Sequence, residues 1–429
     1  MPSSSAAKVV SGISLALLLA SAVAPAPAHA QTFTVLHTFR GSPTDGEAPL
    51  GPLIRDSAGN LYGVAIEGGT GKCGQSGCGM VFALNGTGKE LGGFSFNGKN
   101  GQYPSGGLLR DSAGNFYGTT EQGGQTTEAC GGARGGGCGV AYQLTKTGKE
   151  ALYKFQGTPD GDGPAALLTE DAAGNLYGTT FYGGAKSFGT VFKIDAKGKE
   201  TVLYSFTDSS DGCFPDHGVV LDSAGNLYGV TFDGGFGGSC NSGFGTVYKL
   251  DTTGSLTVLH TFSGGDGANP SSALIFDSEG NLYGTTGNGG SSGGCGLGGC
   301  GTLFELSPQE DGTWSEVVLY SFCSASECVD GEEPLGPLVR DASGNLYGTT
   351  YFGGAHRSCN DEGCGTVFKV DISANETVLY SFTGGADGAF PSAGLALDTS
   401  GNLYGVAEEG GDTACFAPYG CGVVFELAP

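Results

Sequence analysis

Asp171-Ala172-Ala173-Gly174-Asn175-Leu176-Tyr177-Gly178 is one of seven copies of the pattern Asp-x-x-Gly-Asn-Leu-Tyr-Gly in this chain, with Phe116 as the single replacement of the leucine. A fixed motif that returns every 51 to 64 residues is typical of repeat architectures, in which one supersecondary unit is built several times. We therefore expect seven equivalent units, whose motif asparagines are Asn60, Asn115, Asn175, Asn226, Asn281, Asn345 and Asn402.

Each repeat has the sequence pattern of four short strands, and the third repeat shows it clearly. An apolar run over 165–171 is followed by a tight turn and by an aromatic and β-branched run over 176–180. The Gly-Asn pair in the turn supplies the positive φ that a tight hairpin needs. Two further runs, 189–194 and 201–206, complete four antiparallel strands, which is the content of one propeller blade.

The two ends of the chain indicate a closed ring. Residues 34–39 match the fourth strand of a repeat, whereas residues 423–427 match a third strand, so the last repeat lacks its outer strand. A strand supplied by the first residues would complete it and remove the exposed sheet edges. We predict an all-β fold, a seven-bladed β-propeller of four-stranded antiparallel blades closed by the N-terminal strand, in one domain spanning 31–429.

Sequence variation is concentrated in two sets of connections. A proline precedes every first strand and the motif aspartate follows it after seven residues each time, so the inner strand has a fixed length. The loops between the second and third strands, and those leading to the next proline, vary in length instead. Because turns alternate between the ends of a blade, these loops share one face, which we call the loop face, where binding sites on rigid scaffolds are usual.

All fourteen cysteines lie in the loop-face connections. An even number of cysteines in an exported chain indicates disulfides, whereas the spacings differ from those of zinc sites, so no structural metal is expected. Six local pairs and one longer bridge are predicted: Cys73/Cys78, Cys130/Cys138, Cys295/Cys300, Cys323/Cys328, Cys359/Cys364, Cys415/Cys421 and Cys213/Cys240.

The first thirty residues predict export. Lys8, an apolar run over 13–20 and the small-residue site Ala28-His29-Ala30 are the parts of a cleavable signal peptide, here residues 1–30. The run is too short to span a bilayer, and no later segment is apolar enough. A net charge of −24 argues against nucleic-acid partners. We expect a secreted or periplasmic, acidic, monomeric protein.

Gly174 to Thr180, Gly183-Gly184 and Gly189 to Lys193 together resemble the GloVer tandem repeat of exported bacterial proteins. The resemblance covers all seven repeats. It implies export and a β-propeller-like repeat architecture. It implies no catalytic residue, so activity has to be judged from the residues themselves.

The fourth repeat departs from the others behind its proline, where Asp216 and His217 replace the small residues of the other copies. A carboxylate beside an imidazole at the mouth of the ring could act as a general acid and base, or it could be an ordinary pair of surface residues. Glu408 and Glu409 of the seventh repeat are the other asymmetric candidates for catalysis.

Aromatic and acidic residues also follow the second strands, and they include Glu67, Glu121, Tyr182, Asp233, Tyr351 and Phe352. Rings that stack on pyranose faces and carboxylates that accept hydroxyl hydrogen bonds are one way to hold sugars. The alternative is that the aromatic rings only pack against the neighbouring blade.

A ring of aspartates precedes the first strands, and calcium could use their oxygens, although turn formation is the simpler interpretation and no cofactor is expected. These residues are Asp45, Asp160 or Asp162, Asp211, Asp266, Asp330 and Asp387, with Asn100 in the second repeat. His37 and His260 replace the outer-strand tyrosine of other repeats and are expected to be structural.

Two classes of function remain open on these grounds. The first is a non-catalytic extracellular binding propeller, with a glycan or another cell-surface molecule as its ligand, because no catalytic constellation stands out. The second is a polysaccharide-degrading hydrolase or lyase with its site on the loop face.

Overall fold

The computed structural model describes residue 1 and residues 31–429, apart from 127, 131–135, 147, 208–209, 236–239, 241, 292–294, 296–297, 360, 414 and 416–419. The predicted signal peptide therefore lies, except for its first residue, outside the described residues. Gln31–Pro429 form one compact unit. Among the described residues, no helix is both long enough and apolar enough to cross a membrane.

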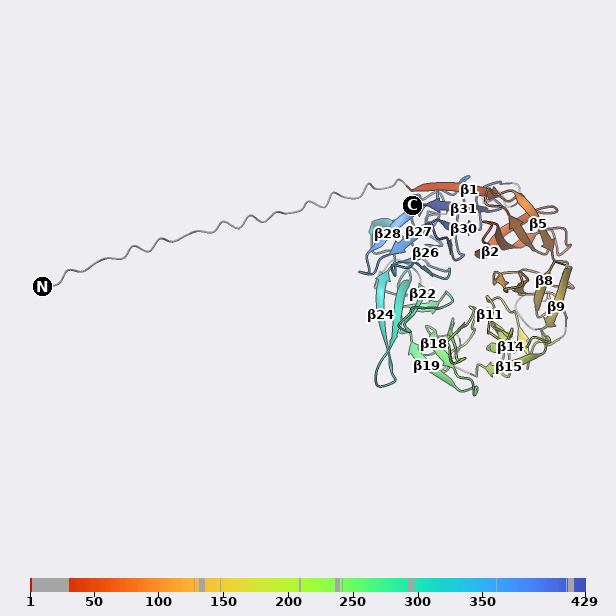
Figure 1. Ribbon diagram of the computed structural model, residues 1–429, viewed down its shortest axis with the longest axis horizontal. Helices are drawn as coiled ribbons and strands as arrows, with labels where there is room; N and C mark the ends of the chain where they lie inside the picture. The colour runs from red at the N-terminus through yellow and green to blue at the C-terminus, as the bar shows by residue number, and fades with distance from the viewer. Residues whose placement is uncertain are drawn as a thin grey trace. The chain divides into compact units, whose positions relative to one another are not determined.

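Gln31–Pro429 fold into a ring of seven antiparallel blades around a central axis (Figure 1). The blades of the first three repeats are β2 (Gly46–Arg55), β3 (Leu61–Gly68), β4 (Met80–Leu84) and β5 (Glu90–Ser95); β6 (Leu109–Arg110), β7 (Phe116–Thr120), β8 (Val140–Thr145) and β9 (Gly148–Lys154); and β11 (Thr169–Glu170), β12 (Leu176–Thr180), β14 (Thr190–Ile194) and β15 (Glu200–Ser205). A short ribbon of β10 (Gly161–Asp162) and β13 (Tyr182–Gly183) accompanies the third blade.

The remaining blades follow the same order. They are β16 (Val220–Leu221), β17 (Leu227–Thr231), β18 (Thr246–Leu250) and β19 (Leu256–Thr261); β20 (Ala268–Pro270), β21 (Ile275–Phe276), β22 (Leu282–Asn288), β23 (Thr302–Pro308) and β24 (Trp314–Ser321), with the 3-10 helix η2 (Ser326–Cys328) after them; β25 (Val339–Arg340), β26 (Leu346–Thr350), β27 (Thr366–Val370) and β28 (Glu376–Ser381); and β29 (Ala396–Leu397), β30 (Leu403–Ala407), β31 (Val423–Ala428) and β1 (Thr32–Thr38).

The N-terminal strand closes the ring as the sequence predicted. β1 pairs antiparallel with β31, from Thr32 opposite Ala428 to Thr38 opposite Val423 (Figure 1). Phe39, which follows β1, is fully buried between the last and first blades. The first and last parts of the propeller are therefore held by the same kind of sheet that holds every other blade.

The repeated motif works through one aspartate. Asp171 Oδ1 accepts hydrogen bonds from the amides of Ala173 and Asn175, both at 2.9 Å. Its Oδ2 accepts from Asn175 Nδ2 at 2.7 Å and from the Tyr177 hydroxyl at 3.0 Å. The backbone amide and side chain of the asparagine and the tyrosine hydroxyl bind in the same way to the other six motif aspartates: Asp56, Asp111, Asp222, Asp277, Asp341 and Asp398.

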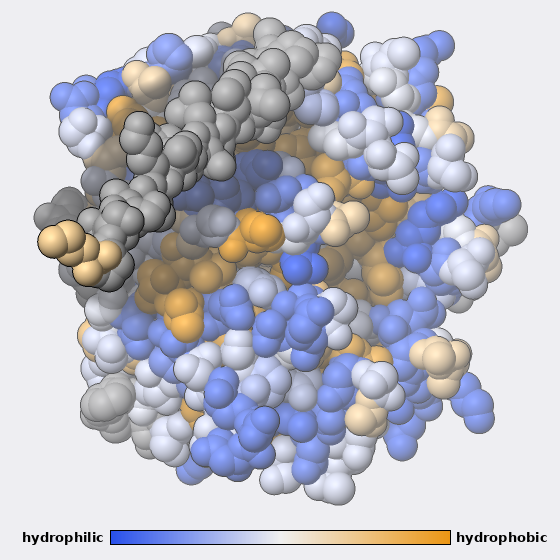
Figure 2. All heavy atoms as spheres, turned by 60° about the vertical axis from the view of Figure 1, so that its left-hand side comes forward, coloured by the Kyte–Doolittle hydropathy of each residue, from blue (hydrophilic) through white to orange (hydrophobic). Residues whose placement is uncertain are grey.

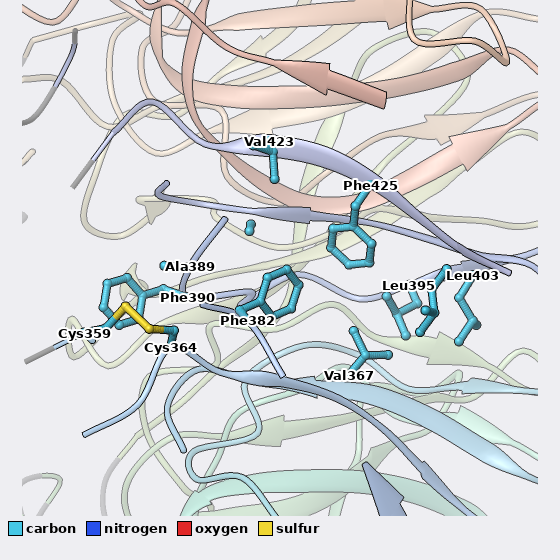
Figure 3. Packing of buried hydrophobic residues seen from close by; sticks show 12 residues of the cluster. Cys359, Cys364, Val367, Phe382, Ala389, Phe390, Leu395, Leu403, Val423 and Phe425 are labelled. Carbon is cyan, nitrogen blue, oxygen red and sulfur yellow. A yellow bond between two sulfur atoms is a disulfide. The ribbon is translucent and has the colours of Figure 1, made fainter. Parts of the chain in front are cut away.

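The last glycine of the motif makes room for the core. A Cβ at Gly178 would lie 2.7 Å from the tip of the Phe192 ring and 2.9 Å from Leu168, closer than such contacts allow. The ring packs on the glycine face of the strand instead. Equivalent buried residues form the interface between blades, for example Val367 and Phe382 of the sixth blade against Leu395, Leu403 and Phe425 of the seventh (Figure 3).

Outside the first blade, where β2 covers ten residues, the inner strands are shorter than expected. The apolar run 165–171 pairs only at Thr169–Glu170, the two residues of β11. Before that point the chain lies against its neighbour, since a Cβ at Gly106 would come within 2.4 Å of the Ala166 backbone. The same holds for Gly51 and Gly336, whose added Cβ would meet the backbone of Gly107 and Ala393, so these small residues allow close approach between blades around the axis.

Candidate functional site

The loop face carries one equivalent pair of residues in every blade. At the end of each second strand, one residue bridges the residue that lies two positions before the proline of the same blade's inner segment. The seven pairs are Glu47/Glu67, Gln102/Gln122, Asp162/Tyr182, Cys213/Asp233, Ala268/Asn288, Glu332/Phe352 and Ala389/Glu409. The predicted residues Glu67, Tyr182, Asp233, Phe352 and Glu409 thus occupy one repeated position, and Glu121, Tyr351 and Glu408 lie one residue before it.

The sequence did not predict an unusual backbone conformation at the residue before the proline of each inner segment. The residue before every one of these prolines has a left-handed backbone conformation, with φ between 52° and 70°, although six of the seven are not glycine. They are Ala48, Tyr103, Gly163, Phe214, Asn269, Glu333 and Phe390. Such conformations are costly for residues with a Cβ and persist only where the surroundings enforce them.

Hydrogen bonds to the preceding blade hold these residues in the left-handed conformation. The amide of each of these residues donates a hydrogen bond to a carbonyl of the blade before it, as Phe390 does to Cys364 at 3.0 Å. In five blades the acceptor is the second cysteine of a local disulfide: Cys78, Cys138, Cys300, Cys364 and Cys421. The loop disulfides therefore hold the acceptor that fixes the next blade's entry to the axis.

The fourteen cysteines form seven disulfides, in the pairs expected from the sequence, and none is free. Cys213 and Cys240, 27 residues apart in the sequence, are bridged with a Cα–Cα distance of 5.6 Å. Two bridges of the fifth blade, Cys295–Cys300 and Cys323–Cys328, lie side by side, with all four sulfur atoms within 4.8 Å of one another.

A cavity of about 510 Å³ opens at the loop-face end of the axis. Small residues such as Gly106, Ala166 and Ala393 line much of it, and larger polar and aromatic side chains come from the second to fourth blades. These larger residues are Glu121, Gln122, Asp162, Phe181, Tyr182, Asp216 and His217. Of the predicted site residues, the described lining includes Glu121, Tyr182, Asp216 and His217 and leaves out Glu67, Asp233, Tyr351, Phe352, Glu408 and Glu409.

A second, apolar cavity of about 260 Å³ continues along the inner segments, and Pro52, Leu167, Gly218, Ala273 and Pro337 line both cavities. The larger cavity thus has polar side chains on the side formed by the second to fourth blades, whereas the second cavity, deeper along the axis, is apolar. Figure 2 shows one side of the ring, on which apolar residues gather in the recessed middle and hydrophilic residues cover the surrounding surface.

Asp216 and His217 meet at the wall of the larger cavity. His217 Nε2 lies 3.4 Å from Asp216 Oδ1, and both side chains are about three-quarters buried, with 25% and 24% exposed. Oδ1 is shielded from solvent and has no hydrogen-bond partner among the described residues. Burial raises the pKa of Asp216, and the imidazole acts in the opposite direction. A carboxyl group of this kind can exchange a proton closer to neutral pH than an exposed aspartate.

Aromatic rings beside the cavity also contact the next blade. Phe181 stacks on Phe214 with ring centres 5.0 Å apart, and Tyr182 meets the same ring edge-on at 5.7 Å. Tyr351 stacks on Phe390 at 5.0 Å in the corresponding place between the sixth and seventh blades. Both pairs of aromatics therefore contribute to packing between blades, and Tyr182 additionally faces the cavity.

Carboxyl groups cluster near Tyr351 and Phe390, between the sixth and seventh blades. Burial raises the pKa of Glu332 to about 6, and Glu333 and Glu362 add to the shift. Burial likewise raises the pKa of Glu408 to about 7, although Ser392 donates a hydrogen bond to it and lowers the value. Ser392 lines the cavity, so Glu408 lies directly behind the wall.

The aspartates before the inner segments mainly stabilise their own loops. Asp211 Oδ2 accepts from the Tyr204 hydroxyl at 2.8 Å and from the Thr207 amide at 3.1 Å. Backbone amides also donate to Asp45, Asp160, Asp266, Asp330 and Asp387. This pattern is typical of turn-forming aspartates.

Comparison with known proteins agrees with the repeat and the ring. The Gloeobacter/Verrucomicrobia repeat matches residues 70–296 and 217–419. No curated protein matches in sequence. A solved extracellular domain, described as that of a hybrid two component system from B. thetaiotaomicron, aligns with a TM-score of 0.50 at 15% identity over 93% of this chain and 41% of its own. This chain thus spans less than half of that protein.

Two enzymes align with lower scores. A gluconolactonase from Xanthomonas campestris has a TM-score of 0.39 at 14% identity, over 67% of this chain and 78% of its own. A luciferin-regenerating enzyme has a TM-score of 0.44 at 12% identity, over 76% of this chain and 91% of its own. At these identities the likeness to solved structures concerns the fold alone.

Proposed function

This chain belongs to the Gloeobacter/Verrucomicrobia repeat family, and from that premise we propose that it is an exported propeller that binds a carbohydrate at the loop-face end of its axis. Its seven disulfides and lack of free cysteines support export, because such bridges persist in oxidising compartments. The N-terminal sequence, with its apolar run and small-residue site, supports the same route.

The observation that carries the binding proposal is the one-sided lining of the 510 Å³ cavity. Ligand sites of this size usually combine an apolar wall with a few convergent polar groups. Here Tyr182 and Phe181 offer ring faces, Glu121 and Gln122 offer hydrogen-bonding atoms, and the small inner residues leave room for the ligand. Rings together with carboxylates suit the alternating apolar and hydroxyl surfaces of a sugar.

Tyr182→Ala and Phe352→Ala test the proposal as a matched pair, because the two residues occupy the same position in different blades and only Tyr182 lines the cavity. A glycan panel identifies the ligand for the wild type, and calorimetry then measures its Kd for each variant. Loss of one aromatic contact of about 1.4 kcal/mol weakens binding about 10-fold in Tyr182→Ala. Equal Kd values for wild type and Tyr182→Ala would refute this site.

A polysaccharide hydrolase or lyase is the second candidate, favoured by the Asp216–His217 pair at the cavity wall. In that case Asp216, with its raised pKa, would give or take the proton, and His217 would act with it. Reducing-end release from the same glycan panel separates the two functions. Release that disappears in Asp216→Asn and His217→Ala, with glycan retention intact, would favour the enzyme.

A further inference from the structure

A second kind of site lies on the outer wall, where neighbouring blades meet. In four places an outer-strand Tyr or His, the loop aspartate of the same blade and a glutamate at the start of the next blade's outer strand come together. Two of these groups contain tyrosine and two contain histidine. They are Tyr153/Asp160/Glu200, Tyr320/Asp330/Glu376, His260/Asp266/Glu316 and His37/Asp45/Glu90.

In the two tyrosine groups the ring hydroxyl binds the loop aspartate directly. The Tyr320 hydroxyl donates a hydrogen bond to Asp330 at 2.7 Å, as the Tyr153 hydroxyl does to Asp160 at 2.8 Å. Glu200 and Glu376 of the next blades interact electrostatically with Asp160 and Asp330; burial and, to a lesser extent, these charges raise the pKa of the two glutamates. In these two groups the tyrosine hydroxyl and the loop amides bind the same aspartate oxygen.

Histidine gives the same place a nitrogen that can bind a metal. His260 Nε2 lies 3.1 Å from Asp266 Oδ2, and Ser263 occupies the other oxygen through its amide at 2.8 Å and its hydroxyl at 3.0 Å. Glu316 Oε1 is shielded from solvent and has no hydrogen-bond partner among the described residues. One ligand atom from each of these three residues lies within 4.8 Å of the others.

We propose that His260, Asp266 and Glu316 form a site for a divalent metal ion of the zinc class, bound between the fourth and fifth blades. Imidazole together with carboxylates suits zinc, whose sites with three protein ligands leave a fourth position for water. Calcium prefers six to eight oxygen ligands, and this group offers a nitrogen and few oxygens. A cation would also offset the repulsion between two half-buried carboxylates.

The His37 group offers the same residue types in a poorer setting. His37 Nε2 is 3.5 Å from Asp45 and 3.8 Å from Glu90, whose side chain is 59% exposed. Arg40 and Lys89 line the hollow beside it, and their positive charges would oppose a second cation. Among the described ion pairs, none joins Asp266 or Glu316 to a lysine or an arginine. The His260 site should therefore bind more tightly than the His37 site.

The zinc site is independent of the proposed carbohydrate site, because none of its three residues lines the axial cavity. His260→Tyr is the natural test, since tyrosine already fills this position in other blades and keeps the hydrogen bond to the aspartate. Oxidised protein, freed of metal with a chelator and shown by thiol titration to have no free cysteine, is titrated calorimetrically with ZnCl₂ and, in parallel, with CaCl₂ and MgCl₂.

The wild type is expected to bind one tight equivalent of zinc, His260→Tyr to lose it, and His37→Tyr to retain it. Tyr320→His should add an equivalent, because Asp330 and Glu376 are already in place. Glu316→Gln provides a second loss-of-ligand variant with nearly unchanged volume. Unchanged zinc affinity in both His260→Tyr and Glu316→Gln, no zinc binding by the wild type, or tight binding of calcium in place of zinc would overturn the proposal.

Discussion

Closure of the propeller can be tested by removing the aromatic side chain of Phe39, which follows the closing strand β1. Phe39 is fully buried, meets the Phe82 ring at 5.0 Å and packs with Val424, so it contacts blades from both ends of the chain. Phe→Ala changes in well-packed cores cost about 3–5 kcal/mol through lost burial and the cavity left behind. We expect Phe39→Ala to lower the free energy of unfolding by that amount.

Phe206 is the matched control, because it follows the outer strand of the third blade, is equally buried and meets the Tyr248 ring at 5.3 Å. Urea unfolding followed by far-ultraviolet circular dichroism gives both free energies. If the closing strand is an integral part of the last blade, the two variants lose similar stability. A loss below about 1 kcal/mol for Phe39→Ala, with the full loss for Phe206→Ala, would show that the N-terminal strand is not docked.

Three further predictions concern acidity, the motif and the disulfides. In motif aspartates such as Asp222, burial raises the pKa, but the hydrogen bonds together outweigh it and lower the pKa. The stability that these aspartates contribute to the folded state is therefore present above their unfolded pKa and is lost as pH falls through their folded pKa. Burial raises the pKa of several glutamates to about 7, so the stability that they contribute to the folded state is present below pH 4.5 and is lost as pH rises toward 7; these are Glu47, Glu200, Glu376 and Glu408. Calorimetric Tm should therefore peak near pH 5, and a Tm that rises steadily from pH 5 to 8 would contradict this. Asp222→Asn should cost about 1.5–3 kcal/mol in urea unfolding because the Asn226 side chain and the Tyr228 hydroxyl both donate to the oxygen it replaces, and an unchanged midpoint would argue against this role. Replacing Cys359 and Cys364 by serine should speed amide exchange at Phe390, which donates to the Cys364 carbonyl, more than at Phe206, and equal rates would show that the bridge does not hold the next blade.

The ring could be predicted from the sequence because its signals are local and repeated. The second strand expected over 176–180 coincides with β12, and the disulfide partners lie a few residues apart except in one blade. The strand expected over 34–39 is found as Thr32–Thr38, so it starts two residues earlier and ends one residue earlier than expected. Seven copies of one pattern average out the ambiguity that a single strand would carry.

The left-handed residues before the prolines and the short inner strands were not predictable in this way. Phe214, Glu333 and Phe390 have side chains that ordinarily avoid positive φ, and only the contact with the preceding blade explains them. Likewise, the cavity brings Glu121, Tyr182 and Asp216 together from three blades, and their proximity depends on the closure of the whole ring. Such contacts between repeats leave little trace within any one repeat.

Closure by β1 also makes the starting point of the chain arbitrary with respect to the fold. Thr32 lies opposite Ala428, so a short linker could join the two ends without disturbing either strand. The exposed turn at Ala196 and Lys197, far from the loop face, could then serve as a new pair of termini. A circular permutant cut there should give the same circular dichroism spectrum, because each blade depends on its neighbours in space and not on its rank along the sequence.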